Sequence, residues 1–227
     1  MSLISHFKRP PPEALKSQIL QMVVDYLTDI SSMAIAPSNP LYNLYQYGIG
    51  YEVHLYLEAM AGGKGVSVEL LLACDPQDPE RVLGFALYLP AAEDPQACAV
   101  AYLAVQASHR RQGIARMLLA EVVARYPHTE LNCVVAKVPW FEALGFQVVG
   151  AKGPQVKLCT HAEPIDSLVA VLDVAPIYSS LEVRQIHAYL LNQHGRKAMV
   201  EAEKKRDRQL DQMTRQAATF VRDRLGR

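Results

Sequence analysis

The sequence predicts an α/β (α+β) protein in which helices flank a central sheet. Three observations support this fold class. Apolar residues recur at helical spacing before residue 31, the apolar period changes to two from Val66, and a strand–helix–strand pattern occupies residues 98–136. The last pattern is typical of a crossover connection within one sheet.

Two helices are expected at the N-terminal end. After three prolines at residues 10–12, apolar residues from Leu15 to Ile30 recur on one helical face. A second helical pattern covers residues 49–60. Gly48 and Gly50 weaken its beginning, because glycine disfavours helix by about 1 kcal/mol relative to alanine.

Three neighbouring antiparallel strands are expected next. Residues 66–72 alternate apolar and polar side chains, including Glu69, as in a strand with one buried face. Residues 82–89 predict the second strand. Residues 98–105 are continuously apolar, which predicts a strand in the centre of the sheet.

The crossover follows, and a hairpin closes the domain. Helical spacing runs from Ile114 up to Pro127, and residues 131–136 return to a short apolar strand. Pro139 opens a short helix that ends at Gly145. Residues 146–149 and 155–159 then predict a hairpin.

Composition limits the classes of protein to consider. The 227 residues are half hydrophobic and carry no net charge, which predicts one main domain with an extension and gives no reason to expect a nucleic-acid partner. The longest apolar run, residues 98–105, is far shorter than the roughly 20 residues of a membrane span, so we expect a soluble, cytoplasmic protein without a membrane partner. The cysteines stand far apart within or beside apolar runs, so we expect reduced core residues and no metal site; they are Cys74, Cys98, Cys133 and Cys159.

A turn between the central strand and the next helix has the composition of a phosphate site. It reads Arg110, Arg111, Gln112, Gly113, Ile114 and Ala115. The first turn of a helix exposes unpaired amide hydrogens, and glycine lets a ligand approach the backbone closely. The arginines, with Arg116, add positive charge beside the positive end of the helix dipole.

Two segments carry a family resemblance. Residues 103–115 resemble motif A of the GNAT acetyltransferase superfamily, and residues 140–146 resemble its motif B. The resemblance implies the acyl-CoA N-acyltransferase fold, a mixed sheet splayed at its fourth strand with acetyl-CoA (coenzyme A) in the gap. It also implies two groups of cofactor-binding residues: Tyr102, Leu103, Ala104 and Val105 along the pantetheine arm, and Arg110, Arg111, Gln112, Gly113, Ile114, Ala115 and Arg116 at the pyrophosphate.

The resemblance implies an N-acetyltransferase whose acceptor is a small-molecule or protein amine, but both usual proton-handling groups are missing. The position of the motif B tyrosine holds Phe141, and the fourth strand has no carboxylate. Glu69, Tyr88 and Tyr102 are the substitutes, each with the alternative of a structural role. A catalytically weak or inactive module that binds or assembles with other proteins is the alternative function.

The last third of the chain lies outside the resemblance. We divide the chain into a domain at residues 1–162 and a helical extension at residues 163–227. A thin apolar stripe along residues 196–227 predicts an amphipathic helix that contacts a partner protein or a second copy. A solvated helix on its own domain is the alternative, and loose nucleic-acid binding is less favoured. The expected seam is Leu210, Met213, Ala217 and Phe220.

Overall fold

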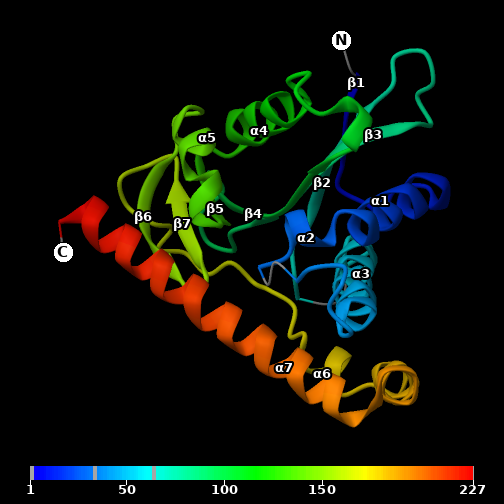
Figure 1. Cartoon of the computed structure of the whole chain (residues 1–227). Helices are drawn as coiled ribbons and strands as arrows, with labels where there is room; N and C mark the ends of the chain where they lie inside the picture. The colour runs from blue at the N-terminus through cyan, green and yellow to red at the C-terminus, as the bar shows by residue number, and fades with distance from the viewer. Residues whose placement is uncertain (1–2, 33–34, 63–64, 227) are drawn as a thin grey trace.

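The computed structural model describes residues 3–32, 35–62 and 65–226. Its described residues contain a seven-stranded sheet, of order β1-β2-β3-β4-β5-β7-β6, with helices on both faces (Figure 1). The strands are β1 (Leu3–Phe7), β2 (Glu69–Cys74), β3 (Val82–Pro90), β4 (Ala97–Val105), β5 (His128–Cys133), β6 (Gln147–Lys152) and β7 (Gln155–Cys159). The helices are α1 (Glu13–Asp25), α2 (Leu27–Ile30), α3 (Tyr42–Ala59), α4 (Ile114–Arg125), α5 (Val138–Glu142), α6 (Ala175–Tyr178) and α7 (Leu181–Leu225), with short 3-10 turns at Ala107–His109 and Val135–Lys137. The predicted fold class is confirmed.

The sheet is mixed, as the resemblance implies. Strands β1 to β4 pair antiparallel, β5 pairs parallel to β4 across the crossover, and β7 inserts antiparallel between β5 and β6. The predicted central position of β4 is therefore confirmed. The edge strand β1 was not predicted, since five residues that include a serine and a histidine carry little pattern.

The strand predicted at residues 66–72 was expected to have one solvated face, and this prediction is wrong. All of β2 is buried, including Glu69 at 6% exposure. One face of the strand packs toward α4 and the other toward α1 and α3, so polar alternation does not imply a solvent face here. The Glu69 carboxylate tolerates burial because four side chains hydrogen-bond or ion-pair with it, as described below.

Helix α3 begins at Tyr42, seven residues before the expected start, and contains both glycines. Gly48 lies against the ring of Tyr178, where an added Cβ would come within 2.8 Å of the Tyr178 hydroxyl oxygen. The glycine at this position therefore permits a close approach of α6 to α3. The first expected helix is also divided, with α1 and α2 separated at Tyr26.

Strands β4 and β5 pair over only four residues of each. Ala97 to Val100 lie opposite His128 to Leu131, after which β4 continues along β3 and β5 continues along β7. A β-bulge lies at the point of divergence, since Leu87 is opposite Tyr102 while Tyr88 is opposite Val100, which leaves Ala101 as an extra residue in β4. A bulge bends its strand and increases the local twist. The two strands therefore splay apart beyond Val100.

The C-terminal extension packs on its own domain. Helix α7 bends at Gly195, whose φ is +78°, and its longer arm runs beneath the sheet from α3 to β6 and β7 (Figure 1). Met199, Ala202 and Ala217 are buried in these contacts. Ala217, which belongs to the seam expected to contact a partner, is therefore buried by contacts within the chain itself. Contact of this helix with a partner stays a prediction. Among the described helices, none combines the length and hydropathy needed to cross a membrane.

Substitution by alanine should change the stability of the fold differently at the two glycines of α3. A Cβ at Gly50 would meet only a methyl of Val24, at an ordinary 3.6 Å. Gly50→Ala should therefore stabilise the fold by about 0.5–1 kcal/mol through helix propensity. Gly48→Ala should give no such gain, because the added Cβ would clash with the Tyr178 ring. Urea unfolding of both variants measures the difference, and an equal gain at the two positions would contradict the close-packing account.

Candidate functional site

A cleft opens where β4 and β5 part. Its volume is about 400 Å³, and its walls come from β4, β5, α2 and α5. It is lined by Tyr26, Asp29, Ile30, Ser31, Val100, Ala101, Tyr102, Leu103, Ala104, Val105, Arg110, Ala115, Leu131, Asn132, Cys133, Val134, Lys137, Trp140, Phe141 and Gln155. Beyond Val100, the β5-facing edge of β4 has no paired strand among the described residues. This edge offers backbone groups to an extended, amide-containing ligand, as a sheet edge does in strand addition.

The predicted phosphate turn lies at one end of this cleft. A second cavity of about 530 Å³ is formed there by Val105, His109, Arg110, Arg111, Gly113, Ile114, Ala115, Arg116 and Trp140, of which Val105, Arg110, Ala115 and Trp140 also line the cleft. The two cavities are therefore adjacent and share a wall.

Two residues of the turn have left-handed backbone conformations. Arg111 has φ +64° and Gly113, the N-cap of α4, has φ +83°. Successive amides in such alternating conformations form a concave anion site, which here joins the N-terminal end of a twelve-residue helix. A left-handed conformation costs a non-glycine residue about 1–2 kcal/mol. Strain at Arg111 is thus the kind of feature that clusters at binding sites.

Arg110 and Lys137 attach α2 to both sides of the cleft. The Arg110 guanidinium forms an ion pair with Asp29 at 2.9 Å, lies 4.6 Å from the centre of the Tyr26 ring, and donates from Nε to the Val105 carbonyl at 3.2 Å. From the β5 side, Lys137 Nζ donates to the Asp29 carbonyl oxygen at 2.6 Å. Helix α2 is therefore held against both splayed strands, and Arg110 has structural partners besides its place at the turn.

Tyr102 is the one candidate for proton transfer, of the three proposed from sequence, that lines the cleft. It follows the bulge in β4, and its ring packs edge-on against Tyr56 of α3, with ring centres 6.5 Å apart. Burial raises the pKa of Tyr102 and of Glu52 on α3, and the two side chains interact with each other. Sequence analysis missed Glu52, since contact between residues fifty positions apart leaves no local pattern.

Glu69 and Tyr88 lie in a different place, among residues that do not line the cleft. Glu69 Oε2 accepts from Tyr88 Oη at 2.9 Å and is 2.8 Å from His6 Nε2, while Oε1 accepts from Tyr126 Oη at 3.0 Å and lies 3.2 Å from Lys8 Nζ. Burial alone would raise the pKa of Glu69, but these hydrogen bonds together hold it below the usual value of 4.5. The arrangement gives the carboxylate a role in holding β1, β2, β3 and the end of α4 together.

Two other cleft residues differ from their sequence interpretation. A large aromatic side chain such as Trp140 favours a place in the core, but Trp140 is 40% exposed and lines both cavities. Asn132 lies within a run that predicts a short apolar strand, yet its Oδ1 is buried without a hydrogen-bond partner. A buried acceptor without a partner costs about 1–3 kcal/mol, so it favours a ligand that donates a hydrogen bond. Phe141, which the motif B resemblance aligns with the usual tyrosine, lies in the cleft wall.

The mixed sheet, splayed between β4 and β5 and followed by the turn and helix α4, is the arrangement that the resemblance implies. Residues 66–148 match the acetyltransferase (GNAT) domain family. The match confirms the resemblance over these residues. No curated protein sequence matches the chain.

Solved structures with a similar fold include acetyltransferases from different organisms. A PaiA N-acetyltransferase from Thermoplasma acidophilum, in complex with coenzyme A, is 11% identical, with 69% of this chain and 97% of that chain covered and a TM-score of 0.48. A GNAT-family acetyltransferase from Staphylococcus aureus is 12% identical, with 70% and 100% covered and a TM-score of 0.44. An aminoglycoside 6'-N-acetyltransferase complexed with coenzyme A is 15% identical, with 75% and 99% covered and a TM-score of 0.46.

The contribution of Glu69 to the stability of the fold should depend on pH. Because the folded pKa of Glu69 is depressed, its contribution to stability is fully present above about pH 4.5 and is lost as the pH falls through the folded pKa. Glu69→Gln should cost about 1–3 kcal/mol at pH 7. The difference from wild type should shrink in unfolding experiments toward pH 3. Glu80→Gln, at an exposed glutamate, is the control, and a pH-independent difference would contradict the assignment.

Proposed function

We propose that this chain binds acetyl-CoA in the cleft between β4 and β5 and transfers its acetyl group to an amine. The observation that carries the proposal is the continuity of the splayed strand edge with the anion-binding turn at α4. GNAT acetyltransferases use acetyl-CoA, and the Thermoplasma PaiA N-acetyltransferase and the aminoglycoside 6'-N-acetyltransferase were solved with coenzyme A. When bound, acetyl-CoA supplies the thioester that an amine attacks.

The residues present fit the chemical parts of this cofactor. Amides from Arg111 to Ala115 would hold the pyrophosphate, with the exposed Arg111 and Arg116 adding positive charge. The backbone of Tyr102 to Val105 would pair with the amide-containing pantetheine arm along the open edge of β4. Asn132 Oδ1 would accept a hydrogen bond in the same region, which would satisfy its buried oxygen.

Proton removal from the amine is assigned to Tyr102 and Glu52. An amine must lose its ammonium proton before it can attack, and a general base does this best when its pKa lies near the working pH. Burial raises the pKa of Glu52, which moves this carboxyl in that direction. Burial also raises the pKa of Tyr102, so its hydroxyl stays neutral and relays a proton from the cleft to the carboxylate.

A specific observation favours the second candidate, a module that binds coenzyme A without efficient transfer. Phe141 cannot protonate a leaving thiolate, and Asp29 is the one carboxylate among the lining residues, already paired with Arg110. Transfer would then depend on water or on the acceptor itself to return a proton to the thiolate. The two functions share the cofactor site and differ only in turnover.

Coenzyme A should bind the wild-type chain, and Gly113→Glu should abolish binding, because the new carboxylate would occupy the anion site. Gly62→Glu is a matched control: Gly62 also has positive φ, at +91° against +83°, has an open Cβ position and lies after α3. Isothermal titration calorimetry decides the matter. Equal affinity in the two variants, or no binding by wild type at millimolar ligand, would exclude the turn as the site.

Acetyl transfer should be detected as release of free coenzyme A thiol in the presence of a panel of small amines and amine-terminated peptides. Glu52→Gln should lower kcat by about 100-fold or more, the usual contribution of a general base, while coenzyme A affinity is unchanged. Glu58→Gln, on the same helix and facing Lys16, controls for the loss of a carboxylate from α3. Binding of coenzyme A without turnover of any amine would favour the non-catalytic module.

A further inference from the structure

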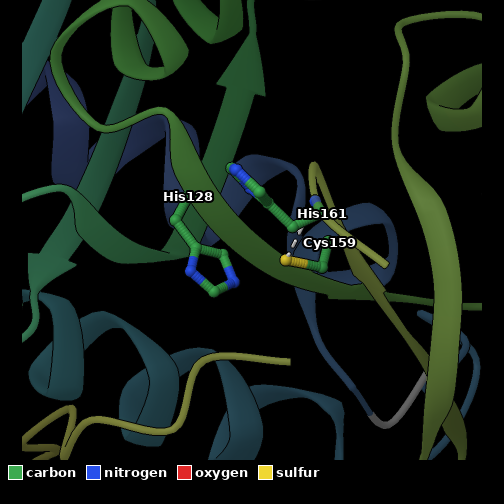
Figure 2. A group of neighbouring side chains, drawn as sticks. All are labelled: His128, Cys159 and His161. Atoms are coloured by element: carbon green, nitrogen blue, oxygen red, sulfur yellow. Dashed lines mark hydrogen bonds between the residues drawn. The ribbon is translucent and has the colours of Figure 1, made fainter. Parts of the chain in front are cut away.

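Three potential metal ligands converge at the end of the sheet that lies away from the splay. His128 begins β5, Cys159 ends β7, and His161 follows two residues later. One ligand atom from each residue lies within 4.8 Å of the others. Figure 2 shows the two imidazole rings beside one another and next to the Cys159 sulfur. Sequence spacing alone predicts no metal site, because antiparallel pairing brings His128 to residues that lie more than thirty positions later in the chain.

Strand pairing fixes the backbone at all three positions. Glu130 lies opposite Cys159, and the same register continued by two residues places His128 opposite His161. Their ring centres are 4.5 Å apart. Thr160 locks the register between them, since its amide donates to the Thr129 carbonyl at 3.0 Å and its Oγ1 accepts from the Thr129 amide at 2.9 Å.

Hydrogen bonds orient one free nitrogen on each ring. His128 Nε2 is 3.1 Å from the Glu163 carbonyl oxygen, which can only accept, so this nitrogen carries the hydrogen and Nδ1 keeps its lone pair. His161 Nδ1 is 3.3 Å from Thr160 Oγ1, whose own hydrogen goes to the Pro127 carbonyl at 2.6 Å. Nδ1 therefore donates and Nε2 is free. Metal-binding histidines are oriented in this way by outer partners.

We propose that His128, Cys159 and His161 bind one zinc ion. A thiolate and two imidazoles are the donors that zinc prefers, whereas calcium and magnesium require oxygen. At zinc bond lengths the ligand atoms of a tetrahedral site with one sulfur and two nitrogens lie roughly 3.3–3.6 Å apart, so the side chains need to close by about 1 Å. The Cys159 thiol gives its proton to solvent as the sulfur–zinc bond forms, and the His161 amide, 3.5 Å away, donates to the sulfur.

The position of the site indicates what the ion does. Cys159 is buried, but His161 is exposed and His128 is partly exposed, so zinc enters from solvent on that side. Three protein ligands leave a fourth position for water. His128 also holds Glu163 at the start of the extension, which continues to α6 and α7. Zinc would thus fasten the beginning of the extension to the strands of the sheet.

Zinc binding is tested on the full chain, expressed without a histidine tag, kept reduced and stripped with a chelator. Competition with a chromophoric chelator should give one zinc ion per chain. Cobalt(II) in place of zinc should show a thiolate-to-metal charge-transfer band and the strong visible bands of a tetrahedral site. Zinc should also raise the Tm. Absence of stoichiometric binding at micromolar zinc would overturn the proposal.

Variants identify the ligands. His161→Gln and Cys159→Ser should weaken zinc binding at least about 100-fold, since even loss of an outer partner costs 10- to 100-fold. Cys159→Ser should remove the cobalt charge-transfer band, whereas Cys74→Ser, at another buried cysteine, should retain it. If Cys159→Ser does not fold, His161→Gln decides alone, because its side chain is exposed. Wild-type affinity in His161→Gln would show that zinc binds elsewhere.

Discussion

The separation of β4 from β5 after Val100 is the constraint on which the rest of the structure depends. An unpaired strand edge in a protein interior is costly, because each backbone donor and acceptor loses water. The bulge at Ala101 directs β4 along β3, while β5 follows β7, and the gap between them remains open to a ligand. Helix α2, held by Arg110 and Lys137, forms a wall of that gap. The same divergence delivers the chain after β4 into the turn at the start of α4.

Sequence pattern predicted the parts of this fold that follow from local physics. The continuous apolar run of β4, the glycine at the start of α4 and the strand–helix–strand order each have a local cause, and the structure contains each. Sequence patterns gave wrong predictions where contacts with residues distant in the sequence determine the burial of a side chain. Glu69 reads as a solvated residue until its four partners are known, and Gly48 reads as a helix breaker until Tyr178 is placed against it. Trp140 reads as a core residue because its exposure in the cleft depends on the splay.

The candidate site divides in the same way. The proposed cofactor-binding part is one contiguous segment from Tyr102 to Arg116, so a single sequence could suggest it. The proposed proton-transfer part joins Glu52 on α3 to Tyr102 on β4, two elements that only packing brings together. Two of the three residues chosen as acid–base candidates instead belong to a cluster at the β1 side of the sheet. A site formed by one strand–turn–helix unit can thus be predicted from the sequence. A site whose residues are brought together only by packing cannot.

Helix α7 bears on how the cleft keeps its shape. Near its middle it contacts α3, where Arg206 donates to the Tyr45 hydroxyl at 3.0 Å. Near its end Ala217 is fully buried in the core beneath β6 and β7, and Arg224 binds Glu142 of α5 at 2.6 Å. Glu142 adjoins Phe141 in the cleft wall, whereas α3 supports Tyr102 on the opposite wall. One continuous helical arm therefore spans the two walls that the splay separates. Its thin apolar stripe, too weak to stabilise an isolated helix, suffices because each half packs on a different wall.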